Sequence, residues 1–209
     1  MLLPLSLENQ QSRPADNPLH FVKGERKLFE WRDARFLRSK PAGLFSAVFS
    51  SYAVALRDMS IPSDPVEVRL IAAAETLPLR LAVLRPGRPI ETAQFRGDDD
   101  AVSRHLGLFH RGELVGIASL FCVEPPGEPN LKAYQLRGMA IAPHCQRKGL
   151  GRLLLEACVE CAHTAGAKVL WCNARTTAVE FYRRFGFEVI GNEFRIPDVG
   201  PHFRMALKL

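Results

Sequence analysis

The feature that most constrains this chain is the segment from Gln146 to Gly151, which holds two glycines between two regularly patterned regions. Before it, the run from Leu136 to Ile141 is typical of a strand. After it, apolar side chains recur at helical spacing, and Gly166 stands where a helix is expected to end. We therefore predict a helix over Gly149 to Ala165, with unpaired N–H groups and the positive end of the helix dipole at the loop. Such a loop is typical of a phosphate-binding site.

The spacing of the glycines separates this loop from two other phosphate-binding motifs. A dinucleotide fingerprint needs a third glycine at position 154, where this chain has leucine, and a P-loop needs a Gly-Lys-Ser/Thr run that the loop lacks. The pattern Q-x-x-G-x-G is instead similar to the signature of the GNAT superfamily of N-acetyltransferases, whose loop amides bind the pyrophosphate of coenzyme A. The resemblance implies that acetyl-CoA contacts Gln146, Arg147, Lys148, Gly149, Leu150, Gly151 and Arg152. The alternative is a glycine loop that only turns the chain.

A second stretch, Ala178 to Phe187, extends the resemblance. It reads A-V-E-F-Y-R-R-F-G-F and, with Asn173 before it, resembles the family pattern N-x-x-A-x-x-F-Y-x-x-x-G-F, apart from a longer spacing after Asn173. In the family, the tyrosine at the position of Tyr182 protonates the departing thiolate of coenzyme A, which implies a general-acid role for Tyr182. The resemblance also implies cofactor contacts for Asn173 and Phe181. In the alternative, Tyr182 only packs, with its hydroxyl on a backbone carbonyl, and Asn173 is a strand-end turn residue.

The strand before the loop is implied to hold the rest of the cofactor. Pantetheine would run beside three of its residues, Met139, Ala140 and Ile141, and Gly138 would mark a bulge that frees a backbone N–H for the developing oxyanion. Many family members place a glutamate base on or beside this strand, but here the strand carries Gln135 and Arg137 and no carboxylate. The candidates for the general base are His105, His110, Glu113 and His202, and a relay of water molecules is the alternative.

From Val66 onward, strand and helix patterns follow one another closely. Val66 to Ile71 alternates as a strand, and Leu77, Leu81 and Leu84 lie at helical spacing. Thr177 and Glu180 have the spacing of a capping box. The order β-α-β-β-β-α-β-α-β-β predicts an α/β (α+β) fold, with a mixed, mostly antiparallel sheet flanked by helices in one GNAT-like domain over residues 65–209.

Residues 1–64 differ from this domain. They contain Pro4, Pro14, Pro18 and Pro41 and show little sustained periodicity. Two alternatives stay open for this N-terminal extension: a disordered or loosely packed tail, or a start-site artefact upstream of Met59.

Composition and charge limit the expected partners. The chain has 209 residues and a formal charge of +6, but its basic residues are scattered, so we expect no nucleic acid partner. The five cysteines lie in apolar stretches and are expected to be reduced, and the C-x-x-C of Cys158 and Cys161 has no second pair, so we expect no metal. No apolar run approaches the roughly 18 residues of a membrane span, and no early signal segment is visible, so we expect a cytoplasmic protein that does not bind membranes. A homodimer is compatible with this composition.

Taken with the resemblance, these features predict an N-acetyltransferase. It would move an acetyl group from acetyl-CoA to a primary amine of a small molecule or protein by direct attack. Arg137, Arg175 and Arg183 favour an acidic or carboxylate-bearing acceptor, and the alternative is that these charges lie on solvated faces. The alternative function is a catalytically silent acyl-CoA-binding module that regulates a partner.

Overall fold

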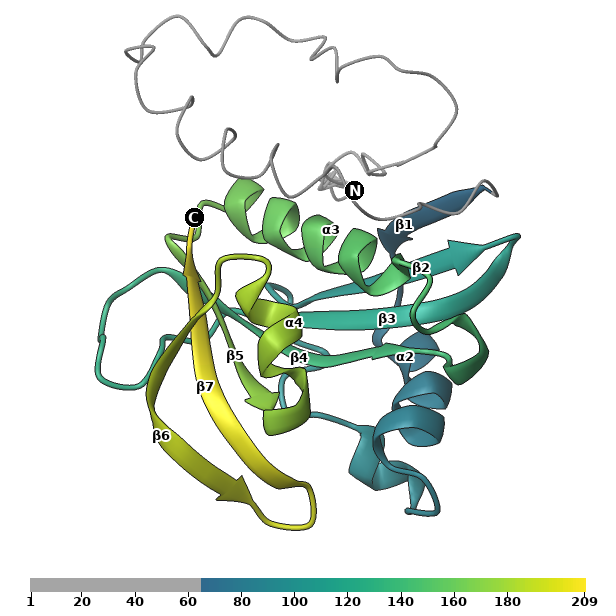
Figure 1. Cartoon of the computed structure of the whole chain (residues 1–209). Helices are drawn as coiled ribbons and strands as arrows, with labels where there is room; N and C mark the ends of the chain where they lie inside the picture. The colour runs from purple at the N-terminus through teal and green to yellow at the C-terminus, as the bar shows by residue number, and fades with distance from the viewer. Residues whose placement is uncertain (1–64) are drawn as a thin grey trace, which may run out of the picture.

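The computed structural model describes residues 65–209, so the expected N-terminal extension lies outside the described residues. One sheet runs in the order β1-β2-β3-β4-β5-β7-β6 (Figure 1). Its strands are β1 Val66–Leu70, β2 Arg104–His110, β3 Glu113–Phe121, β4 Ala133–Ile141, β5 Val169–Arg175, β6 Glu188–Ile196 and β7 Gly200–Lys208. Neighbouring strands are antiparallel except β4 and β5, which are parallel. This mixed, mostly antiparallel sheet with flanking helices confirms the predicted fold class.

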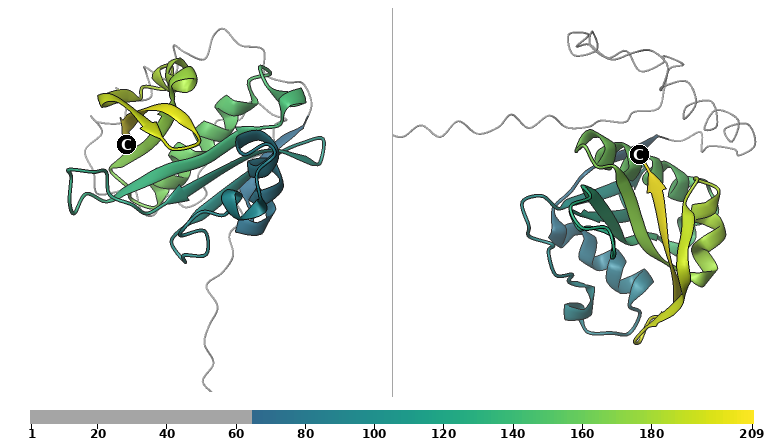
Figure 2. Two further views of the ribbon diagram at one scale, coloured as in Figure 1. Left: turned by 90° about the horizontal axis from the view of Figure 1, so that it is seen from below. Right: turned by 90° about the vertical axis from the view of Figure 1, so that its left-hand side faces the viewer.

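Helices cover both faces of the sheet (Figure 2). On one face, here called the α3 face, lie α3 Leu150–Thr164 and α4 Val179–Arg183. On the opposite face, the α2 face, lie α2 Ala73–Leu79, its π-helical continuation η1 Arg80–Leu84, and the 3-10 turn η2 Ile90–Ala93. Two further 3-10 turns, η3 Pro143–Cys145 and η4 Thr176–Ala178, precede α3 and α4. Within residues 65–209, none of the helices combines the length and the apolar character that a membrane span requires.

The main hydrophobic core lies on the α3 face. Because side chains alternate along a strand, residues two apart point into the core together, as Leu106 and Leu108 do from β2. Helix α3 packs Leu154 and Cys158 against them, both fully buried. The helix begins after Gly149, whose φ is +76°, and ends before Gly166, whose φ is +77°, within one residue of the predicted limits.

The hairpin between β2 and β3 has a two-residue loop. His110 pairs with Glu113, and the loop residues Arg111 and Gly112 have φ angles of 55° and 81°. Two successive positive φ angles match the right-handed twist of the strands, which is why this short connection is stable.

The first helix differs from the expectation. It begins at Ala73, and its buried residues are the polar Thr76 and Arg80, both 0% exposed, while Leu77, Leu81 and Leu84 are only half-buried. Pro78 lies inside α2 and has no N–H to donate, and directly after it the helix widens, so that Arg85 N–H bonds to the carbonyl of Arg80.

The capping box predicted from Thr177 and Glu180, at the start of α4, is wrong. The turn η4 occupies residues 176–178, so Ala178 is the N-cap of α4 and offers no side-chain acceptor. The carboxylate of Glu180 accepts instead from Arg183 at 2.6 Å, one turn further along the helix.

Candidate active site

The central feature of the site is a divergence of the two parallel strands, here called the splay. The pairing of β4 with β5 covers only Ala133–Leu136 and Val169–Cys172. Beyond Leu136 and Cys172, β4 continues to Ile141 and stays paired with β3, while β5 continues to Arg175 and stays paired with β7. The edge of β4 that faces β5 therefore has no strand partner from Arg137 onward among the described residues, which leaves backbone N–H and C=O groups open to a ligand.

A β-bulge lies at the start of this open edge. Ile117 pairs with Ala140 and Ser119 pairs with Arg137, so two β4 residues, Gly138 and Met139, stand opposite a single residue of β3. Gly138 has a φ of +60°, which glycine adopts readily. A Cβ at this position would lie 2.7 Å from the ring of Phe95, so the close approach also requires glycine. The predicted bulge at Gly138 is confirmed.

The loop after β4 presents backbone donors. Arg147 and Gly149 have φ angles of 60° and 76°, and none of the backbone N–H groups from Arg147 to Gly151 donates to a carbonyl within the described part of the chain. The side chain of Gln146 closes the loop onto the strand by donating to the carbonyl of Ile141 at 3.0 Å. These N–H groups at the start of α3 can hold an anion such as a phosphate.

Charged side chains around the loop divide into two kinds. Arg147 and Lys148 are exposed and point their charge to solvent. Arg152 instead pairs with Glu156 at 2.8 Å on the helix, and this carboxylate offsets its charge. Leu150, also named as a cofactor contact, is fully buried in the core, so only its backbone N–H can serve a ligand.

Tyr182 projects from α4 toward the open edge of β4. Its ring is 8% exposed and packs at 5.1 Å from the ring of Phe181 and 5.3 Å from that of Phe187. Its hydroxyl donates to the sulfur of Met139 at 3.7 Å, which is a weak acceptor, and not to a backbone carbonyl. Burial raises the pKa of Tyr182 well above its ordinary value, so the phenol keeps its proton at neutral pH.

Two other residues named from the sequence also lie near the splay. The ring of Phe181 lies beside Gly151, where an added Cβ would be 3.7 Å away, so α4 packs on the start of α3. Asn173 is the first β5 residue past the last pair with β4, and its Oδ1 is buried without a hydrogen-bond partner among residues 65–209. A buried acceptor of this kind is costly unless a ligand or water donates to it.

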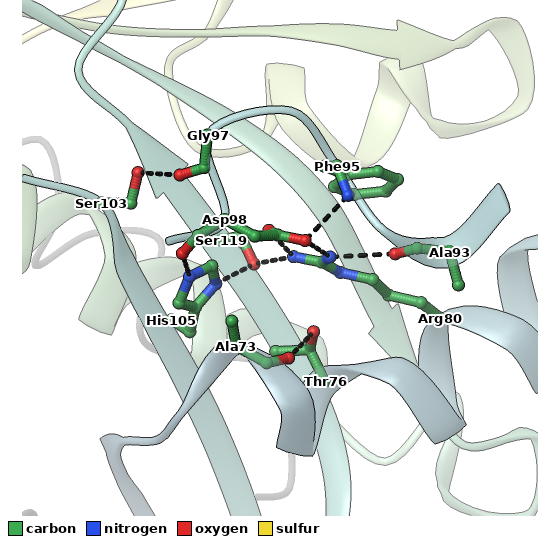
Figure 3. Close-up of polar contacts among 10 residues, drawn as sticks. All are labelled: Ala73, Thr76, Arg80, Ala93, Phe95, Gly97, Asp98, Ser103, His105 and Ser119. Carbon is green, nitrogen blue, oxygen red and sulfur yellow. Dashed lines mark hydrogen bonds and ion pairs between the residues drawn. The ribbon is translucent and has the colours of Figure 1, made fainter. Parts of the chain in front are cut away.

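The structure removes His105 from the list of possible bases. In a buried network on the α2 face, the guanidinium of Arg80 bonds to Asp98 at 2.6 Å and 2.9 Å and to the hydroxyl of Ser119 at 2.7 Å (Figure 3). Since Ser119 accepts from Arg80, its own hydroxyl proton goes to Nδ1 of His105 at 2.8 Å. Nε2 then donates to the carbonyl of Asp98 at 2.9 Å. Both ring nitrogens are engaged, and His105 is structural.

This network was missed in the sequence. No local pattern relates Arg80 to Asp98, and the helical spacing of Leu77, Leu81 and Leu84 predicts a buried face of leucines in this stretch. Burial alone would raise the pKa of Asp98, but hydrogen bonds from Arg80 and from the N–H of Phe95 outweigh it and hold the pKa below its usual range. The one available signal was the four-residue spacing of Thr76 and Arg80, which places two polar side chains on the same helix face.

The remaining candidates for the base lie in two places. His110 and Glu113 flank the turn of the β2–β3 hairpin, where Glu113 is exposed and lies 3.8 Å from His144. His202 is 3% exposed. It lies on β7 opposite Arg175, the residue at which β5 ends after diverging from β4. Its Nδ1 donates to the carbonyl of Gly200 at 2.8 Å, so in the neutral ring Nε2 keeps the lone pair.

Comparisons with known proteins identify the family. A family model described as an acetyltransferase (GNAT) domain matches residues 90–209. An uncharacterized N-acetyltransferase of Bacillus subtilis, YitI, is 33% identical over 140 residues, which cover 67% of this chain and 94% of that protein. The chain belongs to the GNAT acetyltransferase family.

Solved structures share the GNAT fold at lower identity. The acetyltransferase of GNAT family from Streptococcus pneumoniae is 21% identical with a TM-score of 0.53, and the match covers 69% of this chain and 99% of that one. The Salmonella typhimurium protein yncA, whose structure includes its cofactor acetyl-CoA, is 16% identical with a TM-score of 0.53, covering 68% and 93% of the two chains. At these identities the likeness shows a shared fold and nothing more.

The three arginines that favoured an acidic acceptor do not lie together in this GNAT domain. Arg137 and Arg175 belong to the two strands of the splay, and both point to the α2 face, because they share that face with Ser119 and His202. Arg183 lies on α4, on the other side of the sheet, and pairs with Glu180. Arg183 therefore cannot lie in one site with Arg137 and Arg175.

Proposed function

We propose that this GNAT domain transfers an acetyl group from acetyl-CoA to a primary amine of a small molecule or protein. The observation that carries the proposal is the position of Tyr182, whose protonated hydroxyl lies beside the open edge of β4 and, within the described part of the chain, donates to the sulfur of Met139 alone. A phenol held in this way can give its proton to a departing thiolate.

The chain's own groups fit acetyl-CoA, which would supply the acetyl group as a thioester. The N–H groups from Arg147 to Gly151 suit its pyrophosphate, and Arg147 and Lys148 add positive charge nearby. The open edge from Met139 to Ile141 can pair with the amides of pantetheine as an added strand would. The known complex of yncA with acetyl-CoA supports this assignment at the level of the fold.

Two further groups have roles in the proposed reaction. The bulge at Gly138 turns a backbone N–H out of the regular ladder, and this donor can stabilise negative charge on the carbonyl oxygen of the acetyl group. The buried Oδ1 of Asn173 can accept from an N–H of the cofactor at the splay.

The test is steady-state turnover of acetyl-CoA with a panel of small primary amines and lysine-containing peptides, followed by detection of the released thiol. We expect amine-dependent release, and mass spectrometry should show a product heavier by one acetyl group. Binding of coenzyme A without turnover on any amine would instead favour the silent acyl-CoA-binding module.

A further inference from the structure

A cleft of about 320 Å³ opens on the α2 face, between the end of η1 and the β6–β7 hairpin. Arg85, Arg88 and Arg175 line it, and Asp198 is the single acid among its lining residues. Because Arg175 is the last residue of β5, the cleft lies beside the splay, on the side of the sheet opposite α3. Its volume is at the lower end of the range for small-molecule sites.

Two of these arginines have no acidic partner among residues 65–209. Asp198 pairs with Arg88 at 3.7 Å, in an exposed position. Arg85 and Arg175 both donate to the carbonyl oxygen of Leu84, at 3.0 Å and 3.3 Å. In the described part of the chain, no carboxylate lies within ion-pair distance of either guanidinium. Two positive groups from distant segments therefore converge on one neutral oxygen.

The surroundings increase this concentration of positive charge. Burial, followed by repulsion from Arg175 and Arg88, lowers the pKa of Arg85. Burial likewise lowers the pKa of Arg137, with repulsion from Arg80 and Arg85 adding to it, while Asp98 opposes. The guanidinium of Arg137 lies over the rings of Phe95 and Phe121, at 4.8 Å and 4.9 Å, on the β4 side of the splay. An anion between Arg85 and Arg175 would relieve this repulsion.

We propose that Arg85 and Arg175 bind an oxyanion of the acetyl acceptor, so that the acceptor is an amine that also carries a carboxylate or a phosphoryl-type group. The inference rests on the proposed function and names the class of its acceptor. Guanidinium groups are suited to this because their planar N–H forks match carboxylate and phosphate oxygens. The phosphates of coenzyme A have their own donors in the loop before α3, on the far side of the splay.

The test compares three amines that share a two-carbon spacer: β-alanine, aminoethylphosphonate and the neutral β-alaninamide. We expect kcat/KM for the better of the two anions to exceed that for β-alaninamide by about ten-fold to a hundred-fold, as for a charge-assisted hydrogen-bonded contact. The preferred anion distinguishes a carboxylate acceptor from a phosphoryl-type one. Equal rates on all three amines would overturn the inference.

Variants assign the effect to the cleft. Arg175→Gln and Arg85→Gln should each bring the ratio of anionic to neutral amine close to one, while Arg183→Gln, which removes one charge from α4, should leave it unchanged. Thermal melts of each variant with coenzyme A check the fold and the cofactor site together. If the cleft variants lose the stabilisation by coenzyme A but keep the ratio, the arginines serve the cofactor and the inference fails.

A binding measurement separates this inference from the proposed function. Calorimetry would measure the binding of N-acetyl-β-alanine, its carboxamide and N-acetylated aminoethylphosphonate to protein saturated with coenzyme A. Binding of an anion but not of the carboxamide, weakened at least about ten-fold in Arg175→Gln, would support the oxyanion site even if no amine were acetylated. Absence of turnover together with absence of anion-dependent binding would reject both.

Discussion

The phenolic oxygen of Tyr182 lies 3.7 Å from the sulfur of Met139, and this contact joins α4 on one side of the splay to β4 on the other. The hydroxyl proton thus points at the unpaired strand edge. A thiolate formed at this edge would be a far better acceptor than a thioether.

The first prediction follows from this contact. Tyr182→Phe keeps the ring packing against Phe181 and Phe187 but removes the proton. We expect kcat to fall by about ten-fold to a thousand-fold, with the thermal shift by coenzyme A unchanged. Steady-state kinetics and melts on the same preparation measure both. Full activity in this variant would make Tyr182 a packing residue and water the proton source.

The second prediction concerns the phosphate loop. Gly149→Val adds a β-branched side chain where φ is +76°, and we expect it to abolish stabilisation by coenzyme A. The matched control is Gly127→Val, whose φ is +90° and whose added Cβ meets nothing within 4 Å. Both variants should be less stable because of backbone strain, but Gly127→Val should keep the full thermal shift with coenzyme A. A retained shift in Gly149→Val would contradict the assigned loop.

The third prediction concerns the buried ion pair. Asp98→Asn leaves the guanidinium of Arg80, which is 0% exposed, without its counter-charge. We expect the free energy of unfolding to fall by about 3–5 kcal/mol, the usual cost of breaking a buried pair. The control is Glu156→Gln, which breaks the more exposed pair with Arg152 and should cost about 1 kcal/mol or less. Urea unfolding compares them, and equal losses would show that Arg80 is not held by this carboxylate.

The fourth prediction is a loss of stability at high pH. Burial raises the pKa of Cys172 to about 12, whereas the pKa of a cysteine in the unfolded chain is about 8.5. At pH values between these two pKa values, the unfolded chain binds fewer protons than the folded protein. This group's contribution to the free energy of unfolding is therefore fully present below about pH 8.5 and declines as the pH rises above it. The slope in Cys172→Ala, measured by urea unfolding at several pH values, should be shallower. Identical slopes in the two proteins would rule out this source.

The loop and the helix after it could be predicted because their signals are local. The positive φ at Gly149 and the apolar stripe of α3 depend on residues within a few positions of each other. The Arg80 network could not be predicted, because Asp98 and Ser119 lie 18 and 39 residues from Arg80 along the sequence. The leucine spacing of that helix also misled the prediction, since an arginine with a buried partner can take the inner face in place of a leucine.

The cleft arginines show the same limit more strongly. Arg175 reaches the carbonyl of Leu84 across 91 residues, and no local pattern relates the two. Nothing in the sequence distinguishes Arg183 from Arg175, but Arg183 projects from a helix on the other side of the sheet. Which basic residues gather at a site therefore follows from strand register, which sequence patterns alone did not provide.

The short pairing of β4 with β5 has one more consequence. Strands β1 to β4 form one half-sheet and β5 to β7 another. Among residues 65–209, the two halves are joined in the sheet only by the pairs from Ala133–Val169 to Leu136–Cys172. A ligand that pairs with the open edge of β4 and also contacts β5 would extend the connection between the two half-sheets. Amide hydrogens at the junction should then exchange more slowly in the liganded protein than in the empty one, as the two half-sheets become one continuous body.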